Sequence, residues 1–567
     1  MLLSVETVPE HREGDRLPAS NNIALGLLIL LCVAFLVPGL IGHDPWKQDE
    51  TYVFGIIHHI LKSGDWVVPT LAGEPFMEKP PLYYLTAAAS AHFFSAWLPE
   101  HDAARLASGM FMALTLLFVG LTGRELWGRG YGGRAVLVLI GCLGLTRVAH
   151  EMINDVPLLT GFSMAFYGLA LSRRDTVRAG LLIGTGVGIG FLAKGLLAPG
   201  MIGITAVLLP VISASWRRRN YAESLLVATV AVLPWLLIWP LALYQRSPEL
   251  FMNWLWLNNL GRFAGFARLG AEKTETWYYL HTIPWQAWPA LPLALFALWR
   301  VGRAGFKTSA VQLTVLTVLV ILAVLNVAAV ARDLYALPIL VPLSVLAARA
   351  LDELPARIVT ALSWFNILLF GALAAVVWLT WIVMIGTGAP PHIAALSPYL
   401  PLDFRPHFVA LPLVAAIVLS VLWLIAMVRV RHSSLRFIAT WSCGVVLIWG
   451  LLNTLCLSWI DYAKSYRSMA VSLRNALPAH YDCIASVGLG ESQRGMLDYM
   501  VDIDTRRRET NPRAECELLL VETNGNAPDT DPGPGWQEIW QGTRPGDTKE
   551  RHRLYKRITA IAGSRHS

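Results

Sequence analysis

The sequence predicts a polytopic α-helical membrane protein that carries a small α/β domain at its C-terminal end. Hydrophobic residues occupy 55% of the 567 positions and charged residues only 15%, with a mean hydropathy of +0.50, whereas soluble domains carry roughly 25% charged residues. Thirty of the 85 charged residues fall in the last 107 positions. This composition excludes a disordered chain and a disulfide-rich mini-domain. A nucleic-acid-binding protein is excluded because the net charge of +7 is spread over many short loops.

Segments of about 20 apolar residues, long enough to cross a bilayer as helices, recur along the first 460 positions. Four of them contain no Asp, Glu, Lys or Arg, namely 22–42, 310–331, 358–386 and 437–457. Others lie at 102–122, 135–150, 157–172, 179–192, 196–213, 222–244, 281–299, 334–348 and 408–428. The first segment lacks a small-residue cleavage site, so it is expected to be a span and not a signal peptide. We therefore expect about thirteen transmembrane helices.

Lysine and arginine residues cluster in alternate loops between these segments. Because such clusters mark the cytoplasmic side of an inner membrane, we expect a cytoplasmic N-terminus in a bacterial cell and a periplasmic C-terminal domain. The predicted parts are a cytoplasmic tail at 1–21, a transmembrane domain at 22–458 with a periplasmic loop at 43–101, and an α/β domain at 459–567. The clustered residues are Arg124, Arg129, Arg134, Arg173, Arg174, Arg178, Arg217, Arg218, Arg219, Arg300, Arg303, Lys307, Arg349, Arg357, Arg429, Arg431 and Arg436.

The loop at 43–101 is expected to contain two short helices that lie on the membrane surface. Apolar residues recur at helical spacing at Val53, Ile56, Ile57, Ile60 and Leu61, and Gly64 should end this helix. The second helix should begin at Pro80-Pro81, because proline lacks the amide donor that a first helical turn leaves unpaired.

Beyond residue 458 the pattern changes to short elements. Helices are predicted at 464–476 and 491–500, and strands at 481–487, 515–522 and 537–541, which together make a small α/β domain. Cys483 and Cys516 each stand at the start of a predicted strand in an oxidising compartment. They either form a disulfide or are two small buried apolar residues.

Charged residues beside the spans on the outer side are few, and all fall at the membrane rim. Transporters more often place ionisable groups near the bilayer midplane. Lysine and arginine hold phosphate well, and a carboxylate is left for a reacting group. The set therefore suits a substrate with a lipid tail and a phosphate head. The groups are Asp44, Lys47, Asp49 and Glu50; Glu74, Glu78 and Lys79; Asp155; Lys194; Arg262 and Arg268; and Arg332 and Asp333.

The first outer loop carries the most specific pattern. Asp49-Glu50 is followed by Gly64-Asp65-Trp66-Val67-Val68-Pro69 and by Gly73-Glu74-Pro75-Phe76-Met77-Glu78-Lys79-Pro80-Pro81-Leu82-Tyr83-Tyr84. This run resembles the first outer loop of the aminoarabinose lipid A transferase (ArnT) family, within the protein-mannosyltransferase-like glycosyltransferases of the GT-C fold. Weaker matches at 154–157, 191–195, 234–235, 262–263 and 335–338 extend the resemblance over most of residues 22–350.

The resemblance implies a GT-C enzyme that transfers a sugar, with inversion, from an undecaprenyl-phosphate donor. The implied acceptor faces the periplasm and is lipid A or another envelope glycan. Asp49 matches the family's essential loop acid, expected to act with Glu50 as a base or as a stabiliser of charge on the sugar. Asp155 matches a second acid that faces the site. The residues expected to hold the donor phosphate are Lys79, Lys194, Arg262 and Tyr335.

Two positions depart from the family pattern. Tyr52 stands where relatives commonly have an arginine, which removes one expected phosphate ligand. Glu78 matches a position associated with a divalent metal such as Zn, Mg or Mn. However, Asn259 stands where relatives often have a histidine, and an amide oxygen is a poorer zinc ligand than an imidazole.

Two other functions are weighed against this one. A protein O-mannosyltransferase-like enzyme would use a similar donor and differ in its acceptor. A lipid-linked sugar flippase or transporter would be expected to show internal repetition, but the later spans contain no second copy of the Asp-Glu or Glu-Lys-Pro-Pro pattern. A transferase is therefore the preferred interpretation.

Overall fold

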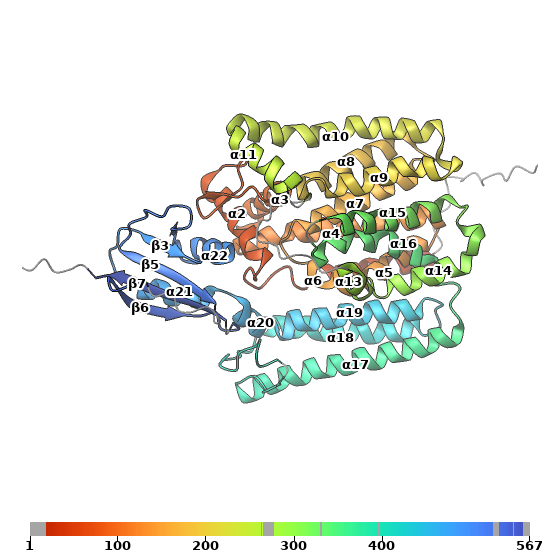
Figure 1. Cartoon of the computed structure of the whole chain (residues 1–567). Helices are drawn as coiled ribbons and strands as arrows, with labels where there is room; N and C mark the ends of the chain where they lie inside the picture. Colours follow the sequence, from red (N-terminus) through yellow and green to blue (C-terminus); the bar gives the residue numbers. More distant parts are fainter. Residues whose placement is uncertain are drawn as a thin grey trace, which may run out of the picture.

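Long helices lie side by side through most of the molecule, and a five-stranded sheet lies at one end of the bundle (Figure 1). The computed structural model describes residues 19–261, 264, 277–328, 331–394, 396–524, 532–547 and 549–558. Eight of the described helices are long and apolar enough to cross a membrane, and four more apolar helices have 10–17 residues. The predicted fold class, a multi-pass helical membrane protein with a small C-terminal domain, is confirmed.

The helices of the bundle and its connecting turns follow one another as α1 (Ala19–Leu36), α4 (Glu100–Trp127), α5 (Tyr131–Ile140), α6 (Leu143–Val148), α7 (Asp155–Leu171), α8 (Thr176–Lys194), α9 (Leu197–Ile212), η1 (Ala214–Trp216), α10 (Arg219–Arg246), α11 (Pro248–Met252), η2 (Asn253–Gly261), α13 (Tyr278–Gln286), α14 (Ala290–Gly305), α15 (Ser309–Val327), η3 (Asp333–Ile339), α16 (Leu340–Ala350), α17 (Ala356–Thr387), α18 (Ala410–Val430) and α19 (Arg436–Leu455). Each predicted span coincides with one of these helices or with a pair of them.

Two segments predicted as single spans are broken in the structure. Segment 135–150 divides into α5 and α6, and segment 281–299 divides into α13 and α14. Pro289 directly precedes α14, and proline cannot donate the N–H that would continue a helix from the preceding turn.

The predicted outer loop contains α2 (Asp49–Ser63), a short hairpin of β1 (Thr70–Leu71) and β2 (Glu74–Pro75), and α3 (Leu82–Phe94). Helix α2 ends where Gly64 adopts a left-handed backbone with φ 72°. Its residues from Glu50 to Ile57 are all buried, because the C-terminal domain covers the helix from outside. Helix α2 is therefore enclosed by protein, in contrast to the surface helix that the sequence predicts.

The C-terminal domain combines three helices with a mixed sheet. The helices are α20 (Leu457–Lys464), which crosses the predicted domain boundary, α21 (Arg467–Ala476) and α22 (Glu491–Val501). Neighbouring strands of the sheet are, in order, β4 (Arg506–Arg507), β3 (Ile484–Val487), β5 (Leu518–Asn524), β7 (Glu550–Arg557) and β6 (Trp536–Gly542). The β4, β3 and β5 strands are parallel, and β7 pairs antiparallel with both β5 and β6.

Strands β4 and β7 are absent from the predicted elements. Strand β4 has only two residues, too few to show alternation. Strand β7 is rich in charge, and the residues that alternate on its buried face are Glu550, His552 and Leu554, of which only Leu554 is apolar. Pairing with a strand on each side is what makes this segment a central strand.

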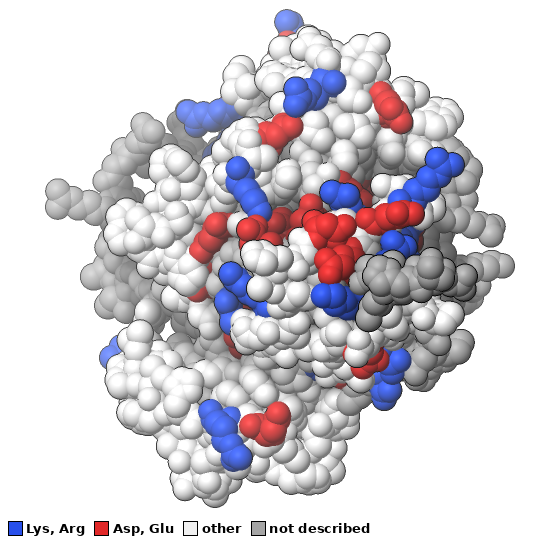
Figure 2. Space-filling model, turned by 90° about the vertical axis from the view of Figure 1, so that its left-hand side faces the viewer, with Lys and Arg blue, Asp and Glu red and all other residues white. Residues whose placement is uncertain are grey.

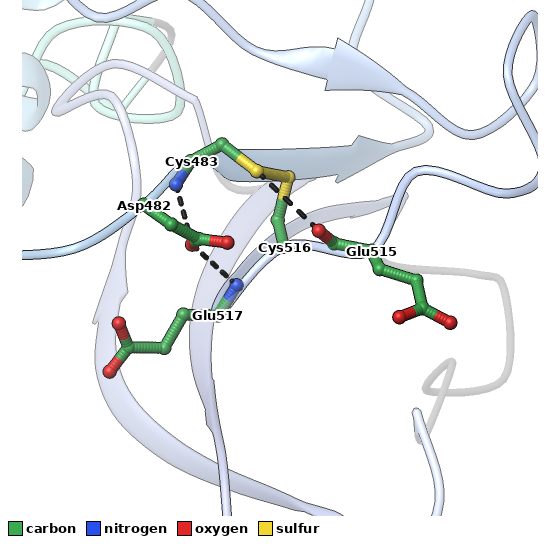
Figure 3. The surroundings of a disulfide bond; sticks show 5 residues. All are labelled: Asp482, Cys483, Glu515, Cys516 and Glu517. Carbon is green, nitrogen blue, oxygen red and sulfur yellow. Dashed lines mark hydrogen bonds between the residues drawn. A yellow bond between two sulfur atoms is a disulfide. The ribbon is translucent and has the colours of Figure 1, made fainter.

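A disulfide joins Cys483, just before β3, to Cys516, just before β5 (Figure 3). These strands are parallel neighbours with Ile484 opposite Leu518, so their preceding residues come together. The Asp482 carboxylate accepts hydrogen bonds from the backbone N–H of Cys483 at 2.5 Å and of Glu517 at 2.8 Å. Of the two alternatives that the sequence leaves open, the structure adopts the disulfide.

Helix α22 packs directly on α2 where two glycines face each other. A Cβ atom on Gly55 would lie 2.9 Å from the Gly495 Cα and 2.7 Å from Leu71 Cδ1. The Lys62 ammonium donates to Asp498 on α22 at 3.1 Å, which reinforces this crossing. The close approach of the two backbones therefore seats the C-terminal domain on the first outer loop.

We expect Gly55→Ala to lower the apparent Tm more than Gly495→Ala. Overpacking costs about 1–3 kcal/mol, against a gain of roughly 0.5–1 kcal/mol from replacing a helical glycine with alanine. At Gly495 the nearest contact of a new Cβ is the movable Leu71 Cδ1 at 3.0 Å, with the Gly55 Cα 3.4 Å away. Thermal unfolding followed by tryptophan fluorescence measures the apparent Tm of both variants. Equal decreases in Tm would contradict the tight packing of α2 against α22 at Gly55.

We expect the double variant Cys483→Ser with Cys516→Ser to destabilise the C-terminal domain by about 3–4 kcal/mol, because the disulfide closes a loop with a sequence separation of 33. Unfolding of the purified protein in denaturant, with and without reductant, checks this. Reduced wild type should behave as the variant does. An oxidised wild type no more stable than the variant would refute the expectation.

Candidate functional site

The two acids at the start of α2 face different surroundings. Successive residues of a helix point in different directions, and Glu50 is turned into the protein, where it is 2% exposed. Its Oε1 accepts from Arg105 Nε at 2.7 Å and from the Met152 N–H at 3.2 Å, and its Oε2 accepts from the Trp46 N–H at 2.9 Å. Burial by itself would raise the pKa of Glu50, but the Arg105 charge holds that pKa below its ordinary value.

Arg105, on α4, is fully buried and ties together the segment that leads into α2. Besides Glu50, its guanidinium donates to Asp102 Oδ1 at 2.8 Å, to the Leu40 carbonyl at 3.3 Å and to the His43 carbonyl at 3.2 Å. The Arg105 guanidinium therefore pairs with two carboxylates and hydrogen-bonds to two carbonyl groups of the segment before α2. These contacts fix where α2 begins.

Asp49 is turned the other way, toward a cluster of bases. Its Oδ1 accepts a hydrogen bond from the Tyr52 hydroxyl at 3.0 Å and lies 3.9 Å from Arg332 Nη1. Burial by itself would raise the pKa of Asp49, but the positive charges of Lys79 and Arg332 outweigh burial and hold the pKa below its ordinary value. Asp49 is therefore ionised at neutral pH.

Tyr52 bridges Asp49 and Lys79. The Lys79 ammonium donates to the Tyr52 hydroxyl at 2.5 Å, and it lies 5.1 Å from the centre of that ring. Burial lowers the pKa of Lys79, but the charges of Glu78 and Asp49 more than offset this and raise it. The lysine is therefore charged although it is half-buried.

A second cluster lies where α7 begins and α8 ends. Asp155, 2% exposed at the first turn of α7, forms an ion pair with Lys194 at the last residue of α8. The Lys194 ammonium also lies 4.2 Å from the centre of the Tyr335 ring. Gly195 follows with φ +68°, and a Cβ there would lie 1.7 Å from Asn259 Oδ1, so glycine is required for this close approach.

Two cavities flank these clusters. The small cavity, of about 110 Å³, has basic and apolar walls, and its lining residues are Glu78, Lys79, Lys194, Leu196, Leu197, Asn258, Asn259, Leu325, Ala328 and Tyr335. The polar cavity, of about 510 Å³, lies between the first outer loop and the C-terminal domain. Its lining residues are Lys47, Gln48, Asp49, Tyr52, Arg332, Gly488, Leu489, Gly490, Glu491, Ser492, Gln493, Arg494, Arg507 and Glu522. Lys79 lines the small cavity, and Tyr52, to which it donates, lines the polar cavity.

The structure brings most of the predicted site residues together. Lys79, Lys194, Tyr335 and Glu78 line the small cavity, and Asp49 lines the polar cavity. Asp155 reaches the small cavity through Lys194. Arg262 lies outside the described residues.

Glu50 lines neither cavity as described, and its contacts are those of a residue that positions α2. Its catalytic role stays a prediction.

Sequence reasoning leaves out three parts of the site: Tyr52, Arg332 and segment 488–494 of the C-terminal domain. In the sequence, Tyr52 stands out only as a departure from the family pattern, and Arg332 only as one of the charges at the membrane rim. The signal for the third part is the Gly488-Leu489-Gly490 turn, which follows a predicted strand and precedes a predicted helix. Such turns often approach ligands closely.

The residues around Glu78 do not fit a zinc ion. Two lysine ammonium groups and the amides of Asn258 and Asn259 share its cavity, whereas zinc is held by three or four thiolate, imidazole or carboxylate ligands. Within the part of the chain that the structure describes, no three His, Cys, Asp or Glu side chains come together as a metal site. We therefore assign no chemical step to a metal ion.

We expect Arg105→Met to destabilise the protein by about 3–5 kcal/mol, because it leaves the buried carboxylates of Glu50 and Asp102 without their cation. Arg219→Met is the matched control, since Arg219 is 91% exposed and pairs at 2.6 Å with Glu223, which is four residues further along α10 and 43% exposed. An exposed pair contributes no more than about 1 kcal/mol. Apparent Tm values of the purified variants make the comparison, and similar losses in both would refute the role of Arg105.

Residues 78–239 match the pattern of the family described as dolichyl-phosphate-mannose-protein mannosyltransferase. The undecaprenyl phosphate-alpha-4-amino-4-deoxy-L-arabinose arabinosyl transferase of Pseudomonas aeruginosa (strain UCBPP-PA14) is 32% identical over 266 residues, 45% of this chain and 46% of the relative. The protein of the same name from Serratia proteamaculans (strain 568) is 27% identical over 280 residues, 47% of this chain and 48% of the relative. The chain spans about half the length of the curated relatives it matches.

Similarity in structure extends further along the chain. ArnT from Cupriavidus metallidurans bound to undecaprenyl phosphate matches with a TM-score of 0.66 at 17% identity, over 95% of this chain and 98% of that one. The apo state of that protein matches with a TM-score of 0.67 at 16% identity over the same shares. At this identity the match shows the fold. The chain thus has the fold of ArnT along most of its length, and its residues 78–239 are similar to the dolichyl-phosphate-mannose-protein mannosyltransferase family.

Proposed function

We propose that the protein is an inverting glycosyltransferase that moves a sugar from undecaprenyl phosphate to an acceptor at the periplasmic face of the bacterial inner membrane. The acceptor is lipid A or another envelope glycan. The observation that carries this proposal is the position of Asp49, an ionised carboxylate that lines the polar cavity and is linked through Tyr52 to Lys79 in the wall of the small cavity. The arabinosyl transferases that share up to 32% identity with the chain support it.

The small cavity suits the phosphate of the donor. Lys79 and Lys194 both line it and can bind phosphate oxygens, and Tyr335 offers a hydroxyl donor from η3. Leu196, Leu197 and Leu325 make the apolar part of the wall, which suits the first isoprene units of a lipid chain. Arg262, on the sequence pattern, is a further phosphate ligand.

In the proposed reaction, an oxygen of the acceptor forms a bond to the anomeric carbon of the sugar. The bond from that carbon to the phosphate oxygen breaks, and its electron pair leaves with polyprenyl phosphate. Lys79 and Lys194 stabilise the negative charge that develops on this phosphate. Because a phosphate ester is a good leaving group, no general acid is required on that side.

The role of Asp49 depends on the acceptor group. A hydroxyl acceptor loses its proton to the Asp49 carboxylate as the new bond forms. A phosphate acceptor is already ionised, and Asp49 then stabilises the positive charge that develops on the sugar. Asp155 acts through Lys194, which it holds over the Tyr335 ring.

The orientation follows from the same proposal. With the basic loops of the bundle in the cytoplasm, both cavities and the C-terminal domain face the periplasm. The acceptor therefore reaches the site from the outer leaflet or from the periplasm.

A protein acceptor is the second candidate, because the family that residues 78–239 match is named for protein mannosylation. Mass spectrometry of lipid A and of envelope glycoproteins from a deletion strain separates the two. Loss of a sugar from lipid A supports the first candidate, and loss from a protein supports the second.

We expect Asp49→Asn to lower the transfer rate roughly 100-fold to 1,000-fold, the loss typical of removing one preorganised charge from an enclosed site. The assay is consumption of defined undecaprenyl-phosphate sugars by purified protein in lipid nanodiscs with lipid A present. Asp403→Asn is the control, because Asp403 is exposed and bonds to Tyr462 outside both cavities. Full activity of Asp49→Asn would refute the proposed function.

A further inference from the structure

We propose that the C-terminal domain positions Asp49 for the reaction by holding the five residues that lead into α2. Residues 44–48, which we call the lead segment, run directly up to Asp49. Asp461 on α20 and Glu550 on β7 are the positioning residues that act through this segment. The inference rests on the proposed function, and it gives the C-terminal domain a part in the reaction that needs no ligand of its own.

The helical bundle holds the lead segment through backbone atoms. Arg105 Nη2 donates to the Asp44 carbonyl at 3.4 Å, and the Trp46 N–H donates to Glu50 Oε2 at 2.9 Å. These contacts leave the side chains of the segment free for other partners. The side chains of Asp44, Trp46 and Lys47 all contact the C-terminal domain.

A single carboxylate oxygen on α20 holds two residues of the lead segment. Asp461 Oδ1 accepts hydrogen bonds from the Asp44 N–H at 3.0 Å and from Trp46 Nε1 at 2.8 Å. The Lys464 ammonium, three residues further along α20, lies 4.7 Å from the centre of the Trp46 ring. Burial raises the pKa of Asp461 to about 6, so this side chain is largely ionised at neutral pH and can accept both bonds.

The Asp44 carboxylate extends the attachment to α21. It accepts hydrogen bonds from the Ser465 hydroxyl at 2.6 Å and from Arg467 Nε at 2.8 Å. Burial by itself would raise the pKa of Asp44, but the hydrogen bonds from Arg467 and Ser465 outweigh burial and lower it. Because a buried charge is costly without its partners, the lead segment and the start of α21 are held together.

Strand β7 and helix α22 hold the end of the lead segment that is nearest to α2. The Lys47 ammonium forms an ion pair with Glu550, whose side chain is 3% exposed and also accepts from the Tyr466 hydroxyl at 3.0 Å. The Ser492 hydroxyl donates to the Gln48 carbonyl at 3.2 Å. Contacts with the C-terminal domain therefore reach the residue that directly precedes the catalytic acid.

The lead segment bears on the rate because the Asp49 carboxylate is itself loosely held. It accepts from the Tyr52 hydroxyl at 3.0 Å and lies 3.9 Å from Arg332 Nη1. Neither contact fixes the backbone that carries Asp49, so the lead segment and α2 must do so. Displacing a reacting group by about 1 Å can lower the rate of an enzyme roughly 100-fold.

The outer face of the molecule is mixed in charge. Figure 2 shows acidic side chains gathered at the centre of this face, with lysine and arginine side chains among and around them. A surface of mixed sign does not attract a charged partner as a whole. The charges of this end of the molecule therefore serve local pairing, and the lead segment is one of the partners that they hold.

Asp461, which accepts two hydrogen bonds from the lead segment, gives the sharpest test. Asp461→Leu removes the acceptor, whereas Asp461→Asn keeps an oxygen that can accept both bonds. We expect kcat to fall roughly 10-fold to 100-fold in Asp461→Leu and to stay within about threefold of wild type in Asp461→Asn. Affinity for undecaprenyl phosphate, measured by titration calorimetry, should change by less than about twofold in both variants, because Lys79 and Lys194 line a different cavity.

Lys62→Met is the matched control. Lys62 also joins the first outer loop to the C-terminal domain, through Asp498 at 3.1 Å and Asp502 at 2.7 Å, but it lies in the last turn of α2. We expect its kcat to stay within about twofold of wild type. An equal fall of kcat in Lys62→Met and Asp461→Leu would show that docking of the domain as a whole limits the rate, and would overturn the role of the lead segment.

Hydrogen exchange followed by mass spectrometry measures the lead segment directly. We expect the peptide that contains residues 44–48 to exchange faster in Asp461→Leu than in wild type, because the Asp44 N–H loses its acceptor. In Asp461→Asn the same peptide should exchange as in wild type. A wild-type kcat or a wild-type exchange rate in Asp461→Leu would overturn the inference, and so would an equal loss of affinity for undecaprenyl phosphate.

Glu550→Gln tests the attachment through the sheet, since it removes the charge that pairs with Lys47 and keeps an oxygen for the Tyr466 hydroxyl. We expect kcat to fall by about tenfold with the affinity for undecaprenyl phosphate unchanged. A wild-type kcat would exclude Glu550 as a positioning residue. All these outcomes differ from failure of the proposed function, in which wild type itself consumes no undecaprenyl-phosphate sugar and the inference falls with it.

Discussion

The buried ion pair between Glu50 and Arg105 is the constraint on which the site depends. Charges removed from water are costly unless each finds a partner, and here one guanidinium serves Glu50, Asp102 and the carbonyls before α2. This arrangement fixes the first turn of α2. Because Asp49 is the preceding residue on that turn, it has to face the other way, toward Lys79 and Arg332.

Asp49, unlike Glu50, is only partly paired. Glu50 is surrounded by donors that saturate it, whereas Asp49 has one hydroxyl and one distant guanidinium, which leaves it accessible in the polar cavity. Tyr52 keeps the Lys79 ammonium from collapsing directly onto Asp49. The lysine is therefore available on one side of the phenol and the carboxylate on the other.

Much of the fold could be predicted from the sequence, because hydrophobic segments are local features. Every predicted span coincides with helix, and Gly64 ends α2 as expected. Strand β7 could not be predicted, since its charged sequence becomes a strand only between β5 and β6. The enclosure of α2 could not be predicted either, because the glycine that receives it, Gly495, lies 440 positions further along the chain.

The sequence by itself determined the membrane class, the presence of the outer acids and bases, and the resemblance through the loop from Asp49 to Tyr84. These depend on composition and on residues close together in the chain. Only the tertiary structure decided the different surroundings of Glu50 and Asp49, the bridge through Tyr52, and the contribution of the C-terminal domain to the polar cavity. The physical reason is that burial and partnership of a charge are set by residues far apart in sequence.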